Sequence, residues 1–157
     1  MKLTLLVIGK TTNHYVKALI DDYVKRVNHY VPFAIEVIPE IRVTKSRSIE
    51  EQKSLEGETL RKQLQAGDYV VLLDEHGVER RSMDFAQWLE KRLAVRFKRL
   101  VFIVGGPYGF ASSIHALANE EISLSQMTFS HQLIRLLFVE QLYRAHTILR
   151  GEPYHHE

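Results

Sequence analysis

The chain has 157 residues, of which 45% are hydrophobic and 25% charged, a composition typical of one ordinary globular domain over residues 1–157. There is no cysteine, which excludes disulfides and thiolate metal sites, and the net charge of +2 permits a nucleic-acid partner without requiring one. No apolar stretch approaches the roughly 20 residues that cross a bilayer, and the first residues lack the apolar run of a signal peptide, so we expect a cytoplasmic protein that contacts no membrane.

The first half of the chain alternates apolar runs with helical patterns. Leu3–Ile8 and Phe33–Ile38 are short apolar runs that predict strands. Between them, Asn13 is placed to cap a helix. Seven residues at helical spacing predict the buried face of this helix: Tyr15, Val16, Leu19, Ile20, Tyr23, Val24 and Val27. The polar segment Arg42–Ser48 predicts a mobile loop, and the helix formers of Ile49–Ala66 predict a second helix.

The second half continues the alternation. Tyr69–Leu73 is apolar throughout and predicts a strand buried on both faces, closed by a turn at Asp74–Gly77. Ser82 is placed to cap the next helix, whose buried side is expected to include Phe85, Trp88, Leu89 and Leu93. The remaining elements are expected at Leu100–Val104 (strand), near Ser113–Ala118 (helix), near Ile122–Leu124 (strand) and from a cap at Ser130 to near Arg150 (helix).

Strands that alternate with helices in this way predict an α/β fold of three layers with a mostly parallel sheet. In such folds ligands bind beyond the carboxyl ends of the strands. The third and fourth predicted strands end at Leu73 and just before Gly105, so these two positions are the first candidates for a binding site.

A glycine-rich loop, Gly105–Gly109, follows the fourth predicted strand. Glycine lets the backbone approach a ligand closely, and such loops often bind phosphate. This loop is not a P-loop, because no Gly-Lys-Ser/Thr follows it, and it lacks the spacing and the later acidic residue of a dinucleotide fingerprint. Pro107 also removes a backbone donor. From spacing alone, a ligand loop and a plain tight turn are equal alternatives.

The segment Leu124–Phe129 carries no charge and mixes apolar with small hydroxyl residues. It could form one wall of an adenine-binding site, with hydrogen bonds from its backbone, although its composition alone favours a plain connector. We refer to it below as the uncharged loop.

The last predicted helix is apolar nearly all round between Leu133 and Val139. Such a helix is buried in the core or covered by a second subunit, and we expect a homodimer that uses it. Arg144 lies on the same helix, and a buried arginine must be paired, so it serves either as a structural contact or as a substrate contact.

Charged residues gather at three places. Lys91–Arg99 and the set Arg42, Lys45 and Arg47 are basic and could contact phosphates, although a solvated surface is the favoured interpretation of each. The chain ends with the polar tail Tyr154–Glu157, which would ordinarily be a disordered end. Its neighbouring histidines lack the geometry of good metal ligands, so we expect no metal.

Taken together, six segments resemble one family, the RlmH-type SPOUT methyltransferases of bacterial ribosomes. The resemblance extends over essentially the whole chain and rests on the order and spacing of the segments, because each motif alone is weak. The segments are Met1–Gly9 (MKLTLLVIG), Val104–Gly109 (VGGPYG), Leu124–Phe129 (LSQMTF), His131–Arg135 (HQLIR), Glu140–Ala145 (EQLYRA) and Tyr154-His155.

The resemblance implies a deep trefoil knot near the C-terminus and an obligate homodimer. The implied activity is transfer of a methyl group from S-adenosylmethionine to N3 of a pseudouridine, pseudouridine 1915 of the 23S rRNA, in the context of the ribosome. Cofactor contacts are implied at Leu73, Gly105, Leu124, Ser125, Gln126, Met127, Thr128 and Phe129.

The implied reaction requires that N3 lose a proton and that negative charge on the neighbouring oxygens be stabilised. We expect His155 to accept the proton, Arg144 to stabilise the charge and Tyr154 to orient the base. One departure from the family is His156, where relatives usually have Lys or Arg. The alternative function is a non-catalytic α/β module that binds RNA or a nucleotide.

Overall fold

The computed structural model describes residues 1–157 and contains one five-stranded sheet. Its strands are β1 (Lys2–Ile8), β2 (Phe33–Ile38), β3 (Asp68–Glu79), β4 (Arg99–Val104) and β5 (Glu120–Ser123). They lie in the order β2-β1-β4-β3-β5, and every neighbouring pair is parallel. The central strands β1 and β4 are covered on both faces, which is why their sequences are continuous apolar runs rather than alternating patterns.

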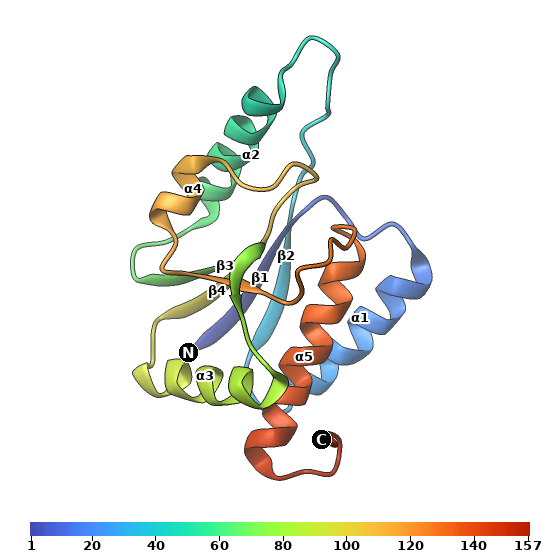
Figure 1. Ribbon diagram of the computed structural model, residues 1–157, viewed down its shortest axis with the longest axis vertical. Helices are drawn as coiled ribbons and strands as arrows, with labels where there is room; N and C mark the ends of the chain where they lie inside the picture. Colours follow the sequence, from blue (N-terminus) through green and yellow to red (C-terminus); the bar gives the residue numbers. More distant parts are fainter.

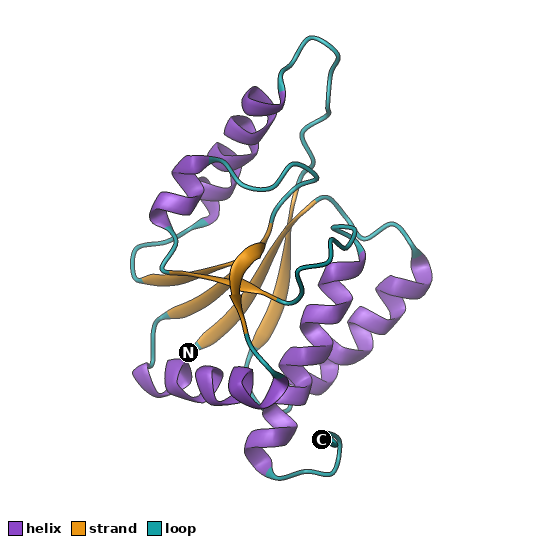
Figure 2. Ribbon diagram, in the orientation of Figure 1, coloured by secondary structure: helices purple, strands orange, loops and turns teal.

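The helices are α1 (His14–Val27), α2 (Ile49–Gln63), α3 (Ser82–Val95), α4 (Ser112–Leu117) and α5 (Leu133–Arg150) (Figure 1). Helices α1, α3 and α5 pack on one face of the sheet, where Ile20, Phe85 and Phe138 join the larger core. Helices α2 and α4 pack on the other face, where Leu60 and Ile114 join the smaller core. The resulting helix–sheet–helix layers, visible in Figure 2, confirm the predicted α/β fold.

The third strand is longer than predicted. β3 continues to Glu79, so the turn predicted at Asp74–Gly77 was wrong. The pairing of β3 with β5 shifts after Leu73, where the chain forms a bulge. At Gly77 the two strands come so close that a Cβ atom would lie 2.6 Å from the backbone of Glu121. Polar residues beside a glycine suggested a turn, whereas residues 74–77 form a bulge inside β3, between Leu73 and Val78, which both pair with Ile122.

The buried face of α1 is narrower than predicted. Tyr15 is 72% exposed and Leu19 is 49% exposed, so the prediction that they are buried was wrong, whereas Ile20 and Val27 are buried. Only the sides of α1 that face α5 and the sheet are covered. The cap was predicted correctly, because the side chain of Asn13 accepts hydrogen bonds from two backbone amides of the first turn.

The predicted caps of the later helices have mixed outcomes. Ser82 is the first residue of α3 rather than its cap, and its hydroxyl donates to Gln141 Oε1 at 2.8 Å instead. Regular α5 begins at Leu133, but the hydroxyl of Ser130 accepts a hydrogen bond from the Leu133 amide at 3.1 Å, as a cap would. Helix α2 ends earlier than predicted.

Two arginines of the basic run Lys91–Arg99 are used inside the fold. Arg92 Nε donates to Glu120 at 2.7 Å, and Arg99 Nη2 donates to Asp68 at 2.6 Å. These guanidinium groups therefore join secondary-structure elements to one another rather than form a phosphate-binding surface. No helix of the structure has the length and apolar character needed to span a membrane. The trefoil knot stays a prediction.

Candidate functional site

A cavity of about 430 Å³ opens at the carboxyl end of β4 and beside the bulge of β3, at the edge where a parallel sheet binds ligands. Its walls come from β3, the glycine-rich loop, the uncharged loop and the first turns of α5. The predicted cofactor residues that line it are Leu73, Gly105, Leu124, Ser125, Met127, Thr128 and Phe129. Gln126 does not line it. Segments far apart in the sequence thus meet around one cavity.

The glycine-rich loop is both a tight turn and a wall of this cavity. The amide of Gly109 donates to the carbonyl of Gly106 at 3.1 Å, and Gly109 has a φ of +81°, in the left-handed region that favours glycine. All five residues of Gly105–Gly109, including Tyr108, line the cavity. A tight turn and a ligand loop, the two alternatives that the spacing left open, are therefore compatible with each other.

Glu56 on α2 lies beneath the glycine-rich loop. A Cβ atom at Gly106 would lie only 2.6 Å from Glu56 Oε2, so a larger residue at this position would displace the Glu56 carboxyl or the loop. The Glu56 side chain accepts one long hydrogen bond, from Gln52 Nε2 at 3.4 Å, and its Oε1 is buried without a partner. Burial raises the pKa of the Glu56 carboxyl. Glu56 cannot be recognised from the sequence, because it is one of several acidic residues in a polar helix.

The uncharged loop is held in place by its own hydroxyl groups and by those next to it. Ser123 Oγ donates to the carbonyl of Ser125 at 2.8 Å, and Ser125 Oγ accepts from the amide of Met127 at 2.9 Å. Thr128 Oγ1 donates to Glu75 at 2.7 Å, which ties the loop to the far part of β3. The backbone of the loop is thereby fixed at the edge of the cavity.

Arg135 is the buried arginine of α5, and only 1% of it is exposed. Its guanidinium donates to the carbonyl oxygens of Ile8 and Gly9, each at 2.8 Å, and to that of His131 at 2.9 Å. Burial lowers the pKa of Arg135. These bonds fasten the start of α5 to the end of β1. The requirement for a paired, buried arginine, which the sequence analysis applied to Arg144, is met here by backbone carbonyls.

The three predicted catalytic residues lie together at the other end of α5. Arg144 Nη2 donates to Glu140 Oε1 at 2.6 Å, and Arg144 Nη1 donates to His155 Nδ1 at 3.1 Å. The hydroxyl of Tyr154 donates to the same Glu140 oxygen at 3.0 Å, and Arg144 Cζ lies 4.8 Å from the centre of its ring. The hydrogen bonds to Glu140 raise the pKa of Arg144, and burial raises that of Tyr154. The tail therefore packs on its own helix, around a carboxylate that the sequence analysis had not assigned a role.

The contact between Arg144 and His155 constrains where the imidazole carries its proton. A guanidinium can only donate, so His155 Nδ1 accepts, and the proton of a neutral ring then lies on Nε2. Nε2 is itself buried and has no partner. In this arrangement the imidazole has no free lone pair with which to take a proton from a substrate.

The tail and the cavity are separate within one chain. None of the three predicted catalytic residues lines the cavity. Ile134 does line it, and Arg144 lies about 15 Å farther along α5 at the helical rise of 1.5 Å per residue. A smaller cavity of about 250 Å³ shares three residues of the uncharged loop with the first cavity and reaches Glu140.

The whole chain matches known methyltransferases. The family model described as a predicted SPOUT methyltransferase matches residues 1–155. The chain therefore belongs to the SPOUT methyltransferase family, which confirms the family that the motifs resemble.

Individual relatives are similar over the full length. The chain is 60% identical to Ribosomal RNA large subunit methyltransferase H of Bacteroides fragilis and 61% identical to the protein of the same name from Phocaeicola vulgatus, with 100% of both chains covered in each case. Among solved structures, one of a probable methylase family protein from Haemophilus influenzae Rd KW20 matches with a TM-score of 0.49 and 12% identity, over 95% of this chain and 66% of that one.

Proposed function

We propose that this protein acts in the cytoplasm and transfers the methyl group of S-adenosylmethionine to N3 of a pseudouridine in the RNA of the large ribosomal subunit. The observation that carries the proposal is the meeting of the glycine-rich and uncharged loops around one cavity, in a chain of the SPOUT family. Relatives of 60% and 61% identity are named as rRNA large subunit methyltransferases, which supports rRNA as the substrate. The choice of pseudouridine N3 rests on the resemblance of the motifs.

The cavity suits S-adenosylmethionine in size and in chemistry. Its volume of about 430 Å³ falls within the usual range for small-molecule sites. Leu73, Leu124 and Phe129 offer apolar surface to an adenine ring, beside the fixed backbone of the uncharged loop. The carboxylates of Asp74 and Glu75 also line the cavity, and negative charge favours a sulfonium cation. When bound, the cofactor supplies an activated methyl group.

The task of the protein is then to position the base and to manage its proton and charge. Arg144 stabilises the negative charge that develops on the oxygens beside N3, and Tyr154 orients the base. In the resting arrangement Arg144 occupies His155 Nδ1. When the guanidinium turns to the oxygen of the base, Nδ1 becomes free to accept the N3 proton. One movement of the Arg144 guanidinium in this way both stabilises the charge on the base and frees His155 to accept the proton.

A second copy of the chain brings the tail to the cavity. Within one chain the tail cluster does not line the cavity, so the reacting groups would otherwise stay apart. The exposed apolar residues Tyr15 and Leu19 on α1, together with Leu133 on α5, offer a surface for a two-fold dimer. In that dimer each copy contributes its tail to the cavity of the other.

Ribosomes from a strain that lacks this protein provide the direct test. Incubation with the purified protein and S-adenosylmethionine is expected to add one methyl group to a pseudouridine of the large-subunit rRNA, detected by mass spectrometry of the digested RNA. Absence of any new methylated nucleoside in free rRNA, large subunits and assembled ribosomes would contradict the proposal.

Calorimetry separates the proposal from the alternative of a non-catalytic binding module. We expect S-adenosylmethionine and S-adenosylhomocysteine to bind and ATP not to bind. Tight binding of ATP without affinity for S-adenosylmethionine would instead favour a nucleotide-binding module.

A further inference from the structure

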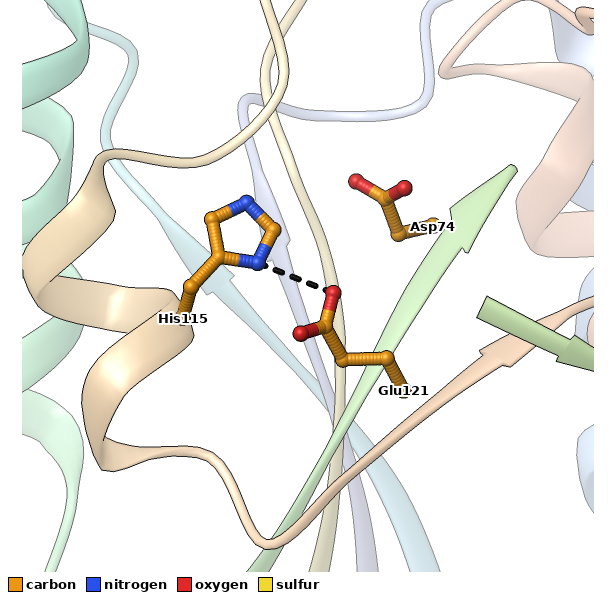
Figure 3. Close-up of side chains that lie close together, drawn as sticks. All are labelled: Asp74, His115 and Glu121. Carbon is orange, nitrogen blue, oxygen red and sulfur yellow. Dashed lines mark hydrogen bonds and ion pairs between the residues drawn. The ribbon is translucent and has the colours of Figure 1, made fainter. Parts of the chain in front are cut away.

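A group of three polar side chains lies at the edge of the cavity. The function proposed above uses only one of them, Asp74, as a source of negative charge near the cofactor, and assigns no role to the other two. Asp74 comes from β3, His115 from α4 and Glu121 from β5 (Figure 3). One donor atom of each lies within 4.8 Å of the other two, and His115 Nδ1 is 2.9 Å from Glu121 Oε1. We propose that these side chains form a binding site for a divalent transition-metal ion such as Zn²⁺.

The fold itself brings the three groups together. Leu72 is paired with Glu121, and Asp74 follows two residues later on the same face of β3, because side chains alternate along a strand. This is the face covered by α4, the helix that carries His115. The close approach of β3 and β5 at Gly77 holds the bulged part of β3 against β5. Three separate elements thus converge on one point.

The charges of the cluster are not balanced by basic side chains. The hydrogen bonds and ion pairs of the Asp74 and Glu121 side chains are to His76 and His115, and neither carboxylate contacts a lysine or an arginine. With neutral imidazoles the two carboxylates carry a charge of about −2. The Asp74 side chain is only 13% exposed, so water screens its charge incompletely. A divalent cation would neutralise the pair.

The donor set favours zinc-like ions over magnesium or calcium. One imidazole nitrogen and two carboxylate oxygens suit Zn²⁺ and related transition metals, whereas Mg²⁺ and Ca²⁺ prefer oxygen ligands in larger number. Tetrahedral ligands with bonds near 2.1 Å lie roughly 3.4 Å apart, so His115 and Glu121 are already close enough. Asp74, within 4.8 Å of both, needs to move inward by at most about 1.4 Å. Asp74 and His115 line the cavity, so the fourth position would be open to water or to a ligand bound there. This proposal departs from the expectation of no metal, which considered only residues near each other in the sequence.

Titration calorimetry with ZnCl₂ tests the site on the full-length protein, freed of any purification tag and without cofactor or RNA. We expect one Zn²⁺ per chain. The substitutions His115→Gln and Glu121→Gln should each weaken binding by at least about tenfold, since even partners outside the ligand set change metal affinity by that much. His29→Gln, which removes an exposed histidine elsewhere, is the matched control and should bind Zn²⁺ as the unmodified protein does. Co²⁺ offers a second readout, because its visible absorption on binding should disappear in His115→Gln.

Two results would overturn the proposal: absence of Zn²⁺ binding by the unmodified protein, or equal affinities of the unmodified protein and His115→Gln. Far-ultraviolet circular dichroism of each variant verifies that it is folded. Glu121→Gln, which hardly changes the shape of the side chain, tests a second ligand independently of His115. Because neither cofactor nor RNA is present, failure of this test leaves the proposed methyl transfer unaffected, and failure of methyl transfer leaves the metal measurement valid.

Discussion

The two ends of α5 are built in different ways. At its start, Arg135 is bound by backbone carbonyl oxygens at the end of β1, and the neighbouring glycine-rich loop packs directly on Glu56. At its end, Arg144, Tyr154 and Glu140 are joined by side-chain contacts on a partly exposed surface. Contacts to the backbone of a buried sheet can break only if the fold opens, whereas partly exposed side-chain contacts can exchange partners. The difference suggests a preformed cofactor end and a tail that changes partners during the reaction.

The largest expected effect is a loss of methyl-transfer rate, which distinguishes the roles of the two ends of α5. Removal of the tail Tyr154–Glu157, or the substitution Arg144→Ala, should lower the rate of methyl transfer by about 10²- to 10³-fold, the effect of losing a group that stabilises transition-state charge. Affinity for S-adenosylmethionine, measured by calorimetry, should stay within about twofold, because the residues that line the cavity within each chain are unchanged. His156→Gln is the control and should retain its rate. A truncated protein that methylates ribosomes at a near-normal rate would contradict this assignment.

The next effect concerns stability at the tail end. Burial lowers the pKa of His146 on α5 to about 4, from its usual 6.5. The unfolded chain therefore binds a proton more readily, so this contribution to stability is complete above pH 6.5 and is lost as the pH falls towards 4. The difference corresponds to about 3 kcal/mol. Urea unfolding from pH 7 to pH 4 should show a steeper loss for the unmodified protein than for His146→Gln, and equal slopes would count against this prediction.

At the cavity end, Gly106→Ala should weaken cofactor binding by about tenfold or more. The added Cβ atom would lie against the Glu56 carboxyl, so that carboxyl or the loop must shift, at a cost of about 1–3 kcal/mol in unfolding free energy. Gly67→Ala is the matched control, because Gly67 has a positive φ but no neighbours within 4 Å of an added Cβ. The control should lose some stability and keep its cofactor affinity. If both variants bind S-adenosylmethionine as well as the unmodified protein does, the glycine-rich loop is not a wall of the cofactor site.

The smallest expected effect is a pH dependence of stability at the cavity end, opposite in sign to that of His146. Burial raises the pKa of Glu56, so the folded protein holds this proton to higher pH than the unfolded chain does. Stability is therefore greatest below the usual carboxyl range and decreases as the pH rises through the raised value. Glu56→Gln should remove that decrease and slightly stabilise the protein near neutral pH. A loss of stability in Glu56→Gln near neutral pH that disappears at low pH would show instead that the charged form is the stabilising one.

Much of the fold could be predicted because the strands are buried on both faces. Continuous apolar runs such as Leu100–Val104 leave little choice of structure, and their alternation with helices determines the layers. The structural predictions were wrong where the conformation or burial of a segment depends on elements that are distant in the sequence. Asp74–Gly77 lies inside a strand because the residues on either side of it, Leu73 and Val78, pair with β5. Tyr15 and Leu19 fit the helical period but lie on a side of α1 that nothing in the chain covers.

Around the cavity, the candidate site was predictable at Leu73 and in its two loops. Gly105 and the uncharged loop stand out because they lie next to strand ends and have unusual composition. Glu56 and Glu140 could not be found in this way, because acidic residues are common on helices and only packing reveals that one lies under a glycine and the other binds Arg144. The same holds for the cluster of Asp74, His115 and Glu121, whose members belong to three different elements.

The most direct test of the account is a mixed dimer of two impaired variants, assayed at a cofactor concentration too low to occupy the weakened cavity, because the account places the cofactor in one copy and the catalytic tail in the other. One chain would lack Tyr154–Glu157 and the other would carry Gly106→Ala, with different tags so that the mixed dimer can be purified. Such a dimer has one intact cavity facing one intact tail, and we predict about half of the normal rate of methyl transfer per dimer. A mixed dimer as inactive as its two parents would contradict a site shared between copies.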